Sequence, residues 1–136
     1  MFKSEKPFGS FSVNDLDKAK EFYHTKLGLE VQPRISDEGV KLLELHIGGG
    51  SKIIAYCKDD HEPAKFTILN FPVKDVEKAV DEMTSSGIIF EHYDSKRLKT
   101  DNKGISRDGG PTIAWFKDPS GNILSVTEEN KMQNND

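Results

Sequence analysis

Two stretches of the chain repeat apolar side chains at the three- and four-residue spacing of an amphipathic helix. Apolar residues recur at Leu16, Ala19, Phe22, Tyr23 and Leu27, and again at Val76, Ala79, Val80 and Met83. Asp15 and Asp75 precede these runs and are suited to cap them, because a short carboxylate accepts the unpaired N–H groups of a first turn. Gly28 and Gly87 stand where a glycine would end each helix. The pattern therefore predicts two helices, each packed on an apolar surface by one face.

Short runs rich in β-branched and aromatic residues follow each predicted helix, and turn residues bound them. They are Leu29–Ile35, Val40–Ile47 and Lys52–Cys57 in the first half, and Ile88–Tyr93, Thr112–Lys117 and Asn122–Thr127 in the second. The strongest turn signals are the glycines at 48–50 and the sequence DPSG at 118–121, in which proline takes the second position. We expect a strand at each run.

An internal repeat with an offset of 60 residues relates the two halves. Residues 11–19 read FSVNDLDKA and residues 71–79 read FPVKDVEKA, so five of the nine positions are identical. Each copy reads as a strand, a capped helix, a glycine and then three strands. The sequence thus predicts an α+β fold of two βαβββ modules within one domain, residues 1–136. Module one is expected over about residues 7–58, module two over about 66–128, and a polar tail over 129–136.

Two polar segments are expected to be loops. Residues 58–65 contain a proline and are interpreted as the linker between the modules. Lys96–Gly110 is polar and unusually long for a loop of a compact domain. Because loops of such length often cover a site, this segment is a candidate lid.

Composition mainly excludes classes of partner. The 136 residues include 23 acidic and 19 basic side chains, a formal charge of −4, so no positive surplus exists to neutralise the phosphates of a nucleic acid. The longest apolar run, Ile53–Cys57, is far shorter than the ~20 residues that span a bilayer, and the first residues lack the apolar stretch of a secretory signal. We expect a cytoplasmic protein without a membrane partner. Its single cysteine, Cys57, cannot form an internal disulfide.

Two motifs, FSVNDLDKAKEFYHTKLGLEV in the first module and FKDPSGNILSV in the second, resemble those of the vicinal oxygen chelate superfamily. This group includes glyoxalase I, extradiol dioxygenases, and fosfomycin- and bleomycin-resistance proteins. The resemblance covers about residues 7–128 and implies a curved mixed sheet around one cleft. It also implies a homodimer, because modules of this superfamily pair within one chain or between two.

The resemblance also identifies where the superfamily's enzymes hold a divalent metal. One ligand is typically a His seven residues before each helix-capping Asp, and the other is a Glu in the last strand of each module. Here these positions fall on Phe8 and Ile68, and on Ala55 and Ser125. Phenylalanine, isoleucine and alanine cannot ligate a cation, and a neutral serine is a poor ligand for first-row metals. We therefore expect no metal cofactor of the usual kind.

Strand alternation extends these positions to their neighbours two and four residues away, which should share their face of the sheet. His46 and Trp115 lie on strands and Arg107 in the long loop, and these three are added as residues able to reach a ligand. The candidate ligand-binding residues are Phe8, Ser10, Ser12, His46, Ala55, Cys57, Ile68, Asn70, Arg107, Trp115 and Ser125. They form an apolar lining with a few small polar groups, which is typical of a pocket for an organic molecule and equally of a filled core.

Several candidates have a second interpretation. Trp115 either stacks on a planar ligand or seals the core, and the core is favoured. Arg107, together with Lys103, either clamps an anionic ligand or is a solvated loop cation. His46 is either a cleft residue or an ordinary strand residue. His61 stands among three acidic residues, a composition that suits a metal cluster but favours a solvated linker.

We expect a small-molecule-binding protein that holds or sequesters an organic ligand without a metal. The alternative is a lyase, isomerase or dioxygenase with a non-standard metal site through His46, Glu44 or Glu91, or with metal-free acid–base chemistry. An interaction or assembly module is a third possibility. The sequence assigns no catalytic residue.

Overall fold

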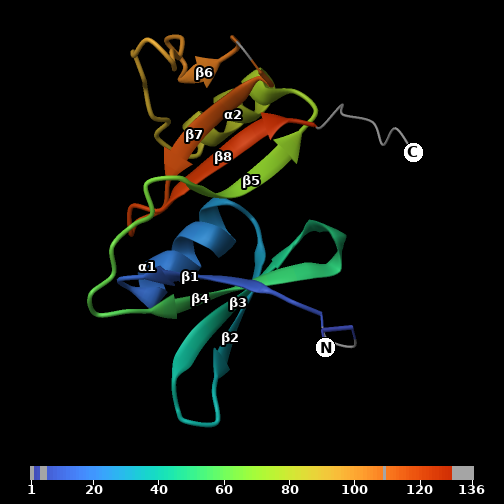
Figure 1. The fold of residues 1–136 in the computed structure, drawn as a ribbon, viewed down its shortest axis with the longest axis vertical. Helices are drawn as coiled ribbons and strands as arrows, with labels where there is room; N and C mark the ends of the chain where they lie inside the picture. Colours follow the sequence, from blue (N-terminus) through green and yellow to red (C-terminus); the bar gives the residue numbers. More distant parts are fainter. Residues whose placement is uncertain (1, 4–5, 109, 130–136) are drawn as a thin grey trace. The chain divides into compact units, whose positions relative to one another are not determined.

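The computed structural model describes residues 2–3, 6–108 and 110–129. The chain divides into two compact units, Met1–Pro63 and Ala64–Asp136 (Figure 1). Each unit contains a four-stranded mixed sheet and a helical segment, as the internal repeat predicts. Within the described residues, no helix is both long enough and apolar enough to cross a membrane.

The sheet of the first unit has the strand order β1–β4–β3–β2. The outer strand β1 (Gly9–Val13) runs parallel to β4 (Ser51–Cys57). The strand β3 (Lys41–Ile47) is antiparallel both to β4 and to β2 (Glu30–Ile35), and the turn η2 (Gly48–Gly50) joins β3 to β4. This unit therefore has the predicted order of a strand, a helix and three strands.

The predicted first helix is observed in two parts. The segment α1 (Leu16–Lys20) begins at Asp15, whose carboxylate accepts a hydrogen bond from the backbone N–H of Lys18, and it continues as the wider π-helix η1 (Glu21–Lys26). The Leu27 N–H donates to the carbonyl of Phe22, five residues earlier. Phe22 and its neighbour Tyr23 are both buried, and the Tyr23 ring lies 5.7 Å from the ring of Phe11 on β1. This helical segment therefore covers one face of the first sheet.

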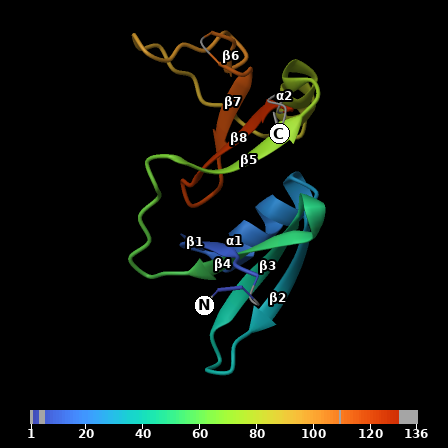
Figure 2. The same cartoon turned by 45° about the vertical axis from the view of Figure 1, so that its right-hand side comes forward.

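The sheet of the second unit has the order β5–β8–β7–β6. The strand β5 (Thr67–Val73) is parallel to β8 (Ile123–Glu128), and β7 (Ile113–Lys117) is antiparallel to both β8 and β6 (Ile105–Ser106). The helix α2 (Val76–Ser85) begins at Asp75, which caps it as predicted. This helix lies on one side of β7 and β8 (Figure 2).

The predicted strand Ile88–Tyr93 is wrong. Only Phe90 forms a bridge there, with Phe116 on β7, and the edge beside β7 is continued by β6, which lies inside the predicted loop Lys96–Gly110. Ile105 of β6 pairs with Ala114, two residues before Phe116, so the chain leaves this edge after residue 91 and returns to it at residue 105. The residues between them form an insertion that local strand propensity does not reveal.

The return of the chain requires a glycine. Gly104 has a φ of +87°, and a Cβ atom there would lie 2.9 Å from the carbonyl oxygen of Glu91. No side chain fits at that distance without a shift of the backbone. Ile105 immediately follows and is buried, so this close approach anchors the insertion to the body of the unit.

The turn between β7 and β8 is organised by a buried carboxylate. Asp118 is 4% exposed and accepts hydrogen bonds from the backbone N–H groups of Ser120 and Asn122, each at 2.9 Å, and from the Asn122 amide Nδ2 at 3.0 Å. Three donors compensate the carboxylate for the loss of water. The motif that the sequence marks as a turn is thus also a polar core of the second unit.

Replacing Asp118 with alanine should lower the free energy of unfolding of the second unit by about 3 kcal/mol, because three buried donors lose a charged acceptor. Urea denaturation followed by the fluorescence of Trp115 measures this change. The matched control is Asp75→Ala, which removes an exposed cap with one backbone hydrogen bond and should cost about 1 kcal/mol. A loss for Asp118→Ala no larger than that for Asp75→Ala would contradict the prediction.

Candidate functional site

The helix leaves one face of the first sheet uncovered. Side chains alternate along each strand, and paired residues on neighbouring strands point to the same side. Because Phe11 and Val13 face the helix, Ser10 and Ser12 of β1 lie on the other side with their partners Ile54 and Tyr56. We call this side the helix-free face of the first sheet; its residues on β1, β4, β3 and β2 are Ser10, Ser12, Lys52, Ile54, Tyr56, Leu42, Glu44, His46, Glu30, Gln32 and Arg34.

The expected grouping of Ala55 and Cys57 with Ser10 and Ser12 is wrong. Ala55 pairs with Phe11 and Cys57 pairs with Val13, so both lie on the helix-covered face. Ala55 is completely buried. The alternation within each strand holds, but the phase between two strands is set by their register, which no local pattern encodes. Phe8 precedes β1 and its side chain is exposed.

A buried carboxylate lies near the centre of this helix-free face. The side chain of Glu44 is only 10% exposed, and three basic side chains surround it. Arg34 Nε lies 3.4 Å and Lys52 Nζ 3.6 Å from Oε2, and His46 Nε2 lies 2.8 Å from Oε1. His46 Nε2 and Glu44 Oε1 are close, but they are not aligned for a hydrogen bond. The Arg34 hydrogen bond lowers the pKa of Glu44 and outweighs burial, which alone would raise it; the charges of Lys52, Arg34 and His46 lower it further.

A second polar contact on this face joins β1 to the segment after β4. Ser12 Oγ lies 2.6 Å from His61 Nδ1, and both residues are half-buried. His61 is therefore not the solvated linker residue that its acidic neighbours favour. Sequence separation hides this contact, because the two residues are 49 positions apart.

The helix-free face of the second sheet has a different chemistry. It is the side to which Ser125 of β8 points, together with its partners Asn70 on β5 and Trp115 on β7. The Ser125 hydroxyl donates to Asn70 Oδ1 at 2.5 Å. The expectation that Asn70 and Ser125 share a face thus agrees with the register, although contact with a ligand stays a prediction.

A β-bulge changes the residues that β5 contributes. Thr67 pairs with Ile123 and Leu69 with Leu124, which leaves Ile68 as the extra residue between them. Thr67 therefore points to the helix-free face beside Asn70, so the bulge adds it to the residues that β5 contributes there. The expected placement of Ile68 on this face stays a prediction, because the extra residue of the bulge has no partner in the β8 register.

Trp115 is held at a fixed angle on this face. Its indole Nε1–H donates to Thr67 Oγ1 at 3.1 Å, and its ring lies edge-on to Tyr93, with centroids 5.6 Å apart and planes at 86°. Burial raises the pKa of Tyr93, and the nearby charge of Glu91 adds to the effect. Trp115 is half-buried, and its neighbour Phe116 is completely buried on the other face of β7, so the choice between sealing the core and stacking on a ligand stays a prediction. We call Thr67, Asn70, Tyr93, Trp115 and Ser125 the Trp115 corner.

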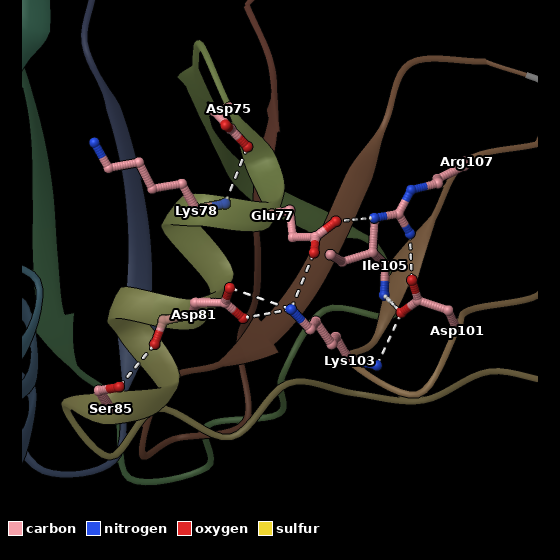
Figure 3. Close-up of polar contacts among 9 residues, drawn as sticks. All are labelled: Asp75, Glu77, Lys78, Asp81, Ser85, Asp101, Lys103, Ile105 and Arg107. Carbon is pink, nitrogen blue, oxygen red and sulfur yellow. Dashed lines mark hydrogen bonds and ion pairs between the residues drawn. The ribbon is translucent and has the colours of Figure 1, made fainter.

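The two loop cations proposed as an anion clamp already have acidic partners, as Figure 3 shows. Lys103 Nζ lies 3.0 Å from both Glu77 and Asp81 of α2, and Arg107 pairs with Glu77 at 2.6 Å and also with Asp101. These ion pairs attach the candidate lid to helix α2. Both cations are also partly exposed to solvent, as the alternative interpretation expects.

Asp101 is the centre of this attachment. Its Oδ1 accepts hydrogen bonds from the backbone N–H groups of Lys103 and Ile105, each at 2.9 Å, and its Oδ2 binds Arg107. Burial alone would raise the pKa of Asp101, but the two backbone hydrogen bonds and the Arg107 guanidinium outweigh it and hold the pKa below its ordinary value. The carboxylate therefore fixes the end of the insertion just before β6.

The residues at the superfamily's metal positions do not fit a metal. Phe8 and Ala55 have no donor atoms, Ile68 is the bulge residue, and the hydroxyl of Ser125 is bonded to Asn70. Across residues 2–3, 6–108 and 110–129, no group of three or more His, Cys, Asp or Glu side chains is arranged to hold a metal ion.

The lowered pKa of Asp101 predicts a pH-dependent stability. A carboxylate with a folded pKa below its ordinary 3.8 stabilises the fold above that pH, and this stabilisation is lost as the pH falls through the lowered value. The wild type should therefore be more stable than Asp101→Asn at pH 7, and the difference should shrink as the pH falls below about 4. Urea denaturation at a series of pH values measures it. The control is Asp108→Asn in the same loop; a difference for Asp101→Asn that does not change with pH would contradict the assignment.

Known proteins share this architecture. The glyoxalase family protein from Enterococcus faecalis has a TM-score of 0.66 at 23% identity, covering 94% of this chain and 100% of that one. TnmS3, an antibiotic binding protein from Streptomyces sp. CB03234, has a TM-score of 0.61 at 19% identity, covering 93% and 98%. The uncharacterized protein YraH of Bacillus subtilis (strain 168) is 29% identical over 129 residues, 84% of this chain and 90% of that protein.

These structural likenesses confirm the predicted fold class of two βαβββ modules. At this level of identity they establish the fold and not the activity. The sequence profile of one superfamily matches residues 10–126, which is most of the chain. The chain therefore belongs to the Glyoxalase/Bleomycin resistance protein/Dioxygenase superfamily.

Proposed function

We propose that this protein binds a small organic molecule at the Trp115 corner and holds it unchanged, without a metal. The observation that carries the proposal is the fixed orientation of the Trp115 ring. Its N–H donates a hydrogen bond to Thr67, and the ring packs edge-on against the ring of Tyr93. The indole therefore needs no rearrangement to receive a planar ligand. A preorganised surface loses little conformational entropy on binding.

Polar groups beside the ring supply directional contacts. The Asn70 side chain is exposed, and the hydrogen bond from Ser125 fixes its carbonyl end. The amide NH₂ group is then the part of Asn70 that a ligand would meet as a donor. An apolar or aromatic surface with a few oriented polar groups is the usual composition of a site for an organic ligand.

Two further facts favour binding over chemistry. The metal positions of the superfamily carry Phe8, Ala55, Ile68 and Ser125, which do not fit a cation. TnmS3, which shares the fold, is an antibiotic binding protein. Sequestration needs no acid, base or nucleophile at the site, and the hydroxyl of Ser125 is engaged with Asn70.

Titration of the purified protein with bleomycin and with a tricyclic quinone tests the proposal. At least one of them should quench the fluorescence of Trp115 and be recovered with an unchanged mass. Trp115→Ala should weaken binding at least tenfold, about 1.4 kcal/mol, because the stacking surface is lost. The readout for this variant is isothermal titration calorimetry, since the fluorophore is gone.

The matched control is Ile89→Ala, which removes an exposed apolar side chain of the same unit outside the corner. It should leave the affinity unchanged. Unaltered binding by Trp115→Ala, or the absence of binding by either compound, would count against the proposal. Stoichiometric nickel, zinc, manganese or iron in the purified protein, found by elemental analysis, would overturn its metal-independent part.

The second candidate function is metal-free acid–base chemistry on the first sheet. The specific observation is the 2.8 Å contact between Glu44 and His46, which places an imidazole against a carboxylate that is ionised at neutral pH. Turnover of a glutathione hemithioacetal, a catechol or fosfomycin that His46→Ala abolishes would support an enzyme. Lys41 lies on the other face of the same strand. Turnover by Lys41→Ala equal to that of the wild type would verify that the loss of activity in His46→Ala is specific.

The assembly state and the location of the protein stay predictions. A homodimer is expected from the resemblance to the superfamily, and a cytoplasmic location is an expectation from the sequence. Neither is needed for binding at the Trp115 corner, whose five residues all belong to the second unit.

A further inference from the structure

The contact between Ser12 and His61 is built by two independent structural elements. Ser12 is the fourth residue of β1 and lies on the helix-free face of the first sheet. His61 follows β4, the strand that runs parallel to β1. The Lys58 N–H donates to the carbonyl of Val13, which continues the pairing of the two strands up to the turn that contains His61.

A tight turn fixes the position of His61. Its backbone N–H donates to the carbonyl of Lys58 at 3.0 Å, which closes a four-residue turn. The side chains of Lys58 and Asp60 form an ion pair across the same turn at 2.5 Å. The hydrogen bond from Lys58 lowers the pKa of Asp60, and the same bond raises the pKa of Lys58. The imidazole is thus returned over the end of β1, where Nδ1 meets Ser12 Oγ at 2.6 Å.

We propose that Ser12 is a nucleophile for which His61 is the general base, and that it takes up acyl or phosphonyl groups from reactive esters. A serine within hydrogen-bond distance of an imidazole is the arrangement that activates a hydroxyl. The pair is half-buried, so a small electrophile can reach it. In this assignment Nδ1 carries no proton and Ser12 Oγ–H donates to it, while Nε2 holds the ring proton.

The chemistry balances with an ester and water as the only reactants. Ser12 Oγ forms a bond to the carbonyl carbon as its proton passes to His61 Nδ1. The carbon–oxygen bond to the alcohol then breaks, and the leaving oxygen takes the proton from His61. Water hydrolyses the resulting serine ester by the reverse proton path and releases a carboxylic acid. A fluorophosphonate reacts in the first step only, with loss of fluoride and formation of a stable phosphorus–oxygen bond to Ser12.

This activity is separate from binding at the Trp115 corner. Ser12 and His61 both belong to the first unit, and the corner belongs to the second. Loss of either activity in a variant therefore leaves the other one measurable. The other role for this contact is structural, in which it only holds the turn against the sheet. The experiment distinguishes a His61 that acts as a general base from a His61 with this structural role.

The test is covalent labelling of the full chain with a fluorophosphonate, followed by intact-mass and peptide mass spectrometry, together with hydrolysis of p-nitrophenyl acetate. We expect one adduct per chain, on the peptide that contains Ser12. Ser12→Ala should abolish the adduct. His61→Ala should slow labelling at least tenfold, and added imidazole should restore part of the rate, because a free base can replace the missing one.

The matched control is Ser51→Ala, which removes an exposed hydroxyl of the same unit, at the opposite end of β4 from the turn that contains His61, and should not change the rate. Circular dichroism verifies that each variant is folded. An adduct that persists in Ser12→Ala, or His61→Ala labelled as fast as the wild type, would overturn the proposal. Slower labelling of His61→Ala that imidazole does not restore would assign His61 to fastening the turn and would also overturn it.

Discussion

The parallel pairing of the first and last strand of each unit is the constraint on which the other features depend. The β1–β4 register places Phe11 beside Ala55, and the β5–β8 register places Asn70 beside Ser125. Because side chains alternate, one pairing decides for a whole sheet which residues lie under the helix and which lie on the helix-free face. Both candidate sites, and the Ser12–His61 contact, follow from these two registers.

The two helix-free faces carry different side chains, although both units have the same order of strands and helix. The first carries an ion-pair group around Glu44, whereas the second carries the Trp115 corner with its oriented ring and amide. Burying a charge costs free energy unless partners compensate it. Apolar residues of similar size at the same positions would often give the fold equal stability. The group around Glu44 makes the helix-free face of the first sheet the more strongly charged of the two.

Two buried carboxylates show how position decides the role of the same functional group. Asp118 accepts three hydrogen bonds from its own turn and so holds β7 and β8 together. Glu44 instead meets three basic side chains from its own and neighbouring strands on a sheet face. Asp118 is thus stabilised by local hydrogen bonds, whereas Glu44 is stabilised by charged side chains from three different strands.

The sequence by itself determined the two modules, the capping roles of Asp15 and Asp75, and the turn at Asp118, because these features are local or repeated. It also predicted that the metal positions hold residues unsuited to a cation. Only the tertiary structure decided the phase between strands, which moved Ala55 and Cys57 to the helix side, and the bulge that adds Thr67 to the helix-free face. It alone revealed that Ile105 continues the edge beside β7 and that His61 meets Ser12. Strand register, bulges and contacts across 49 residues arise from packing between distant segments, and no local pattern of hydrophobic and polar residues records them.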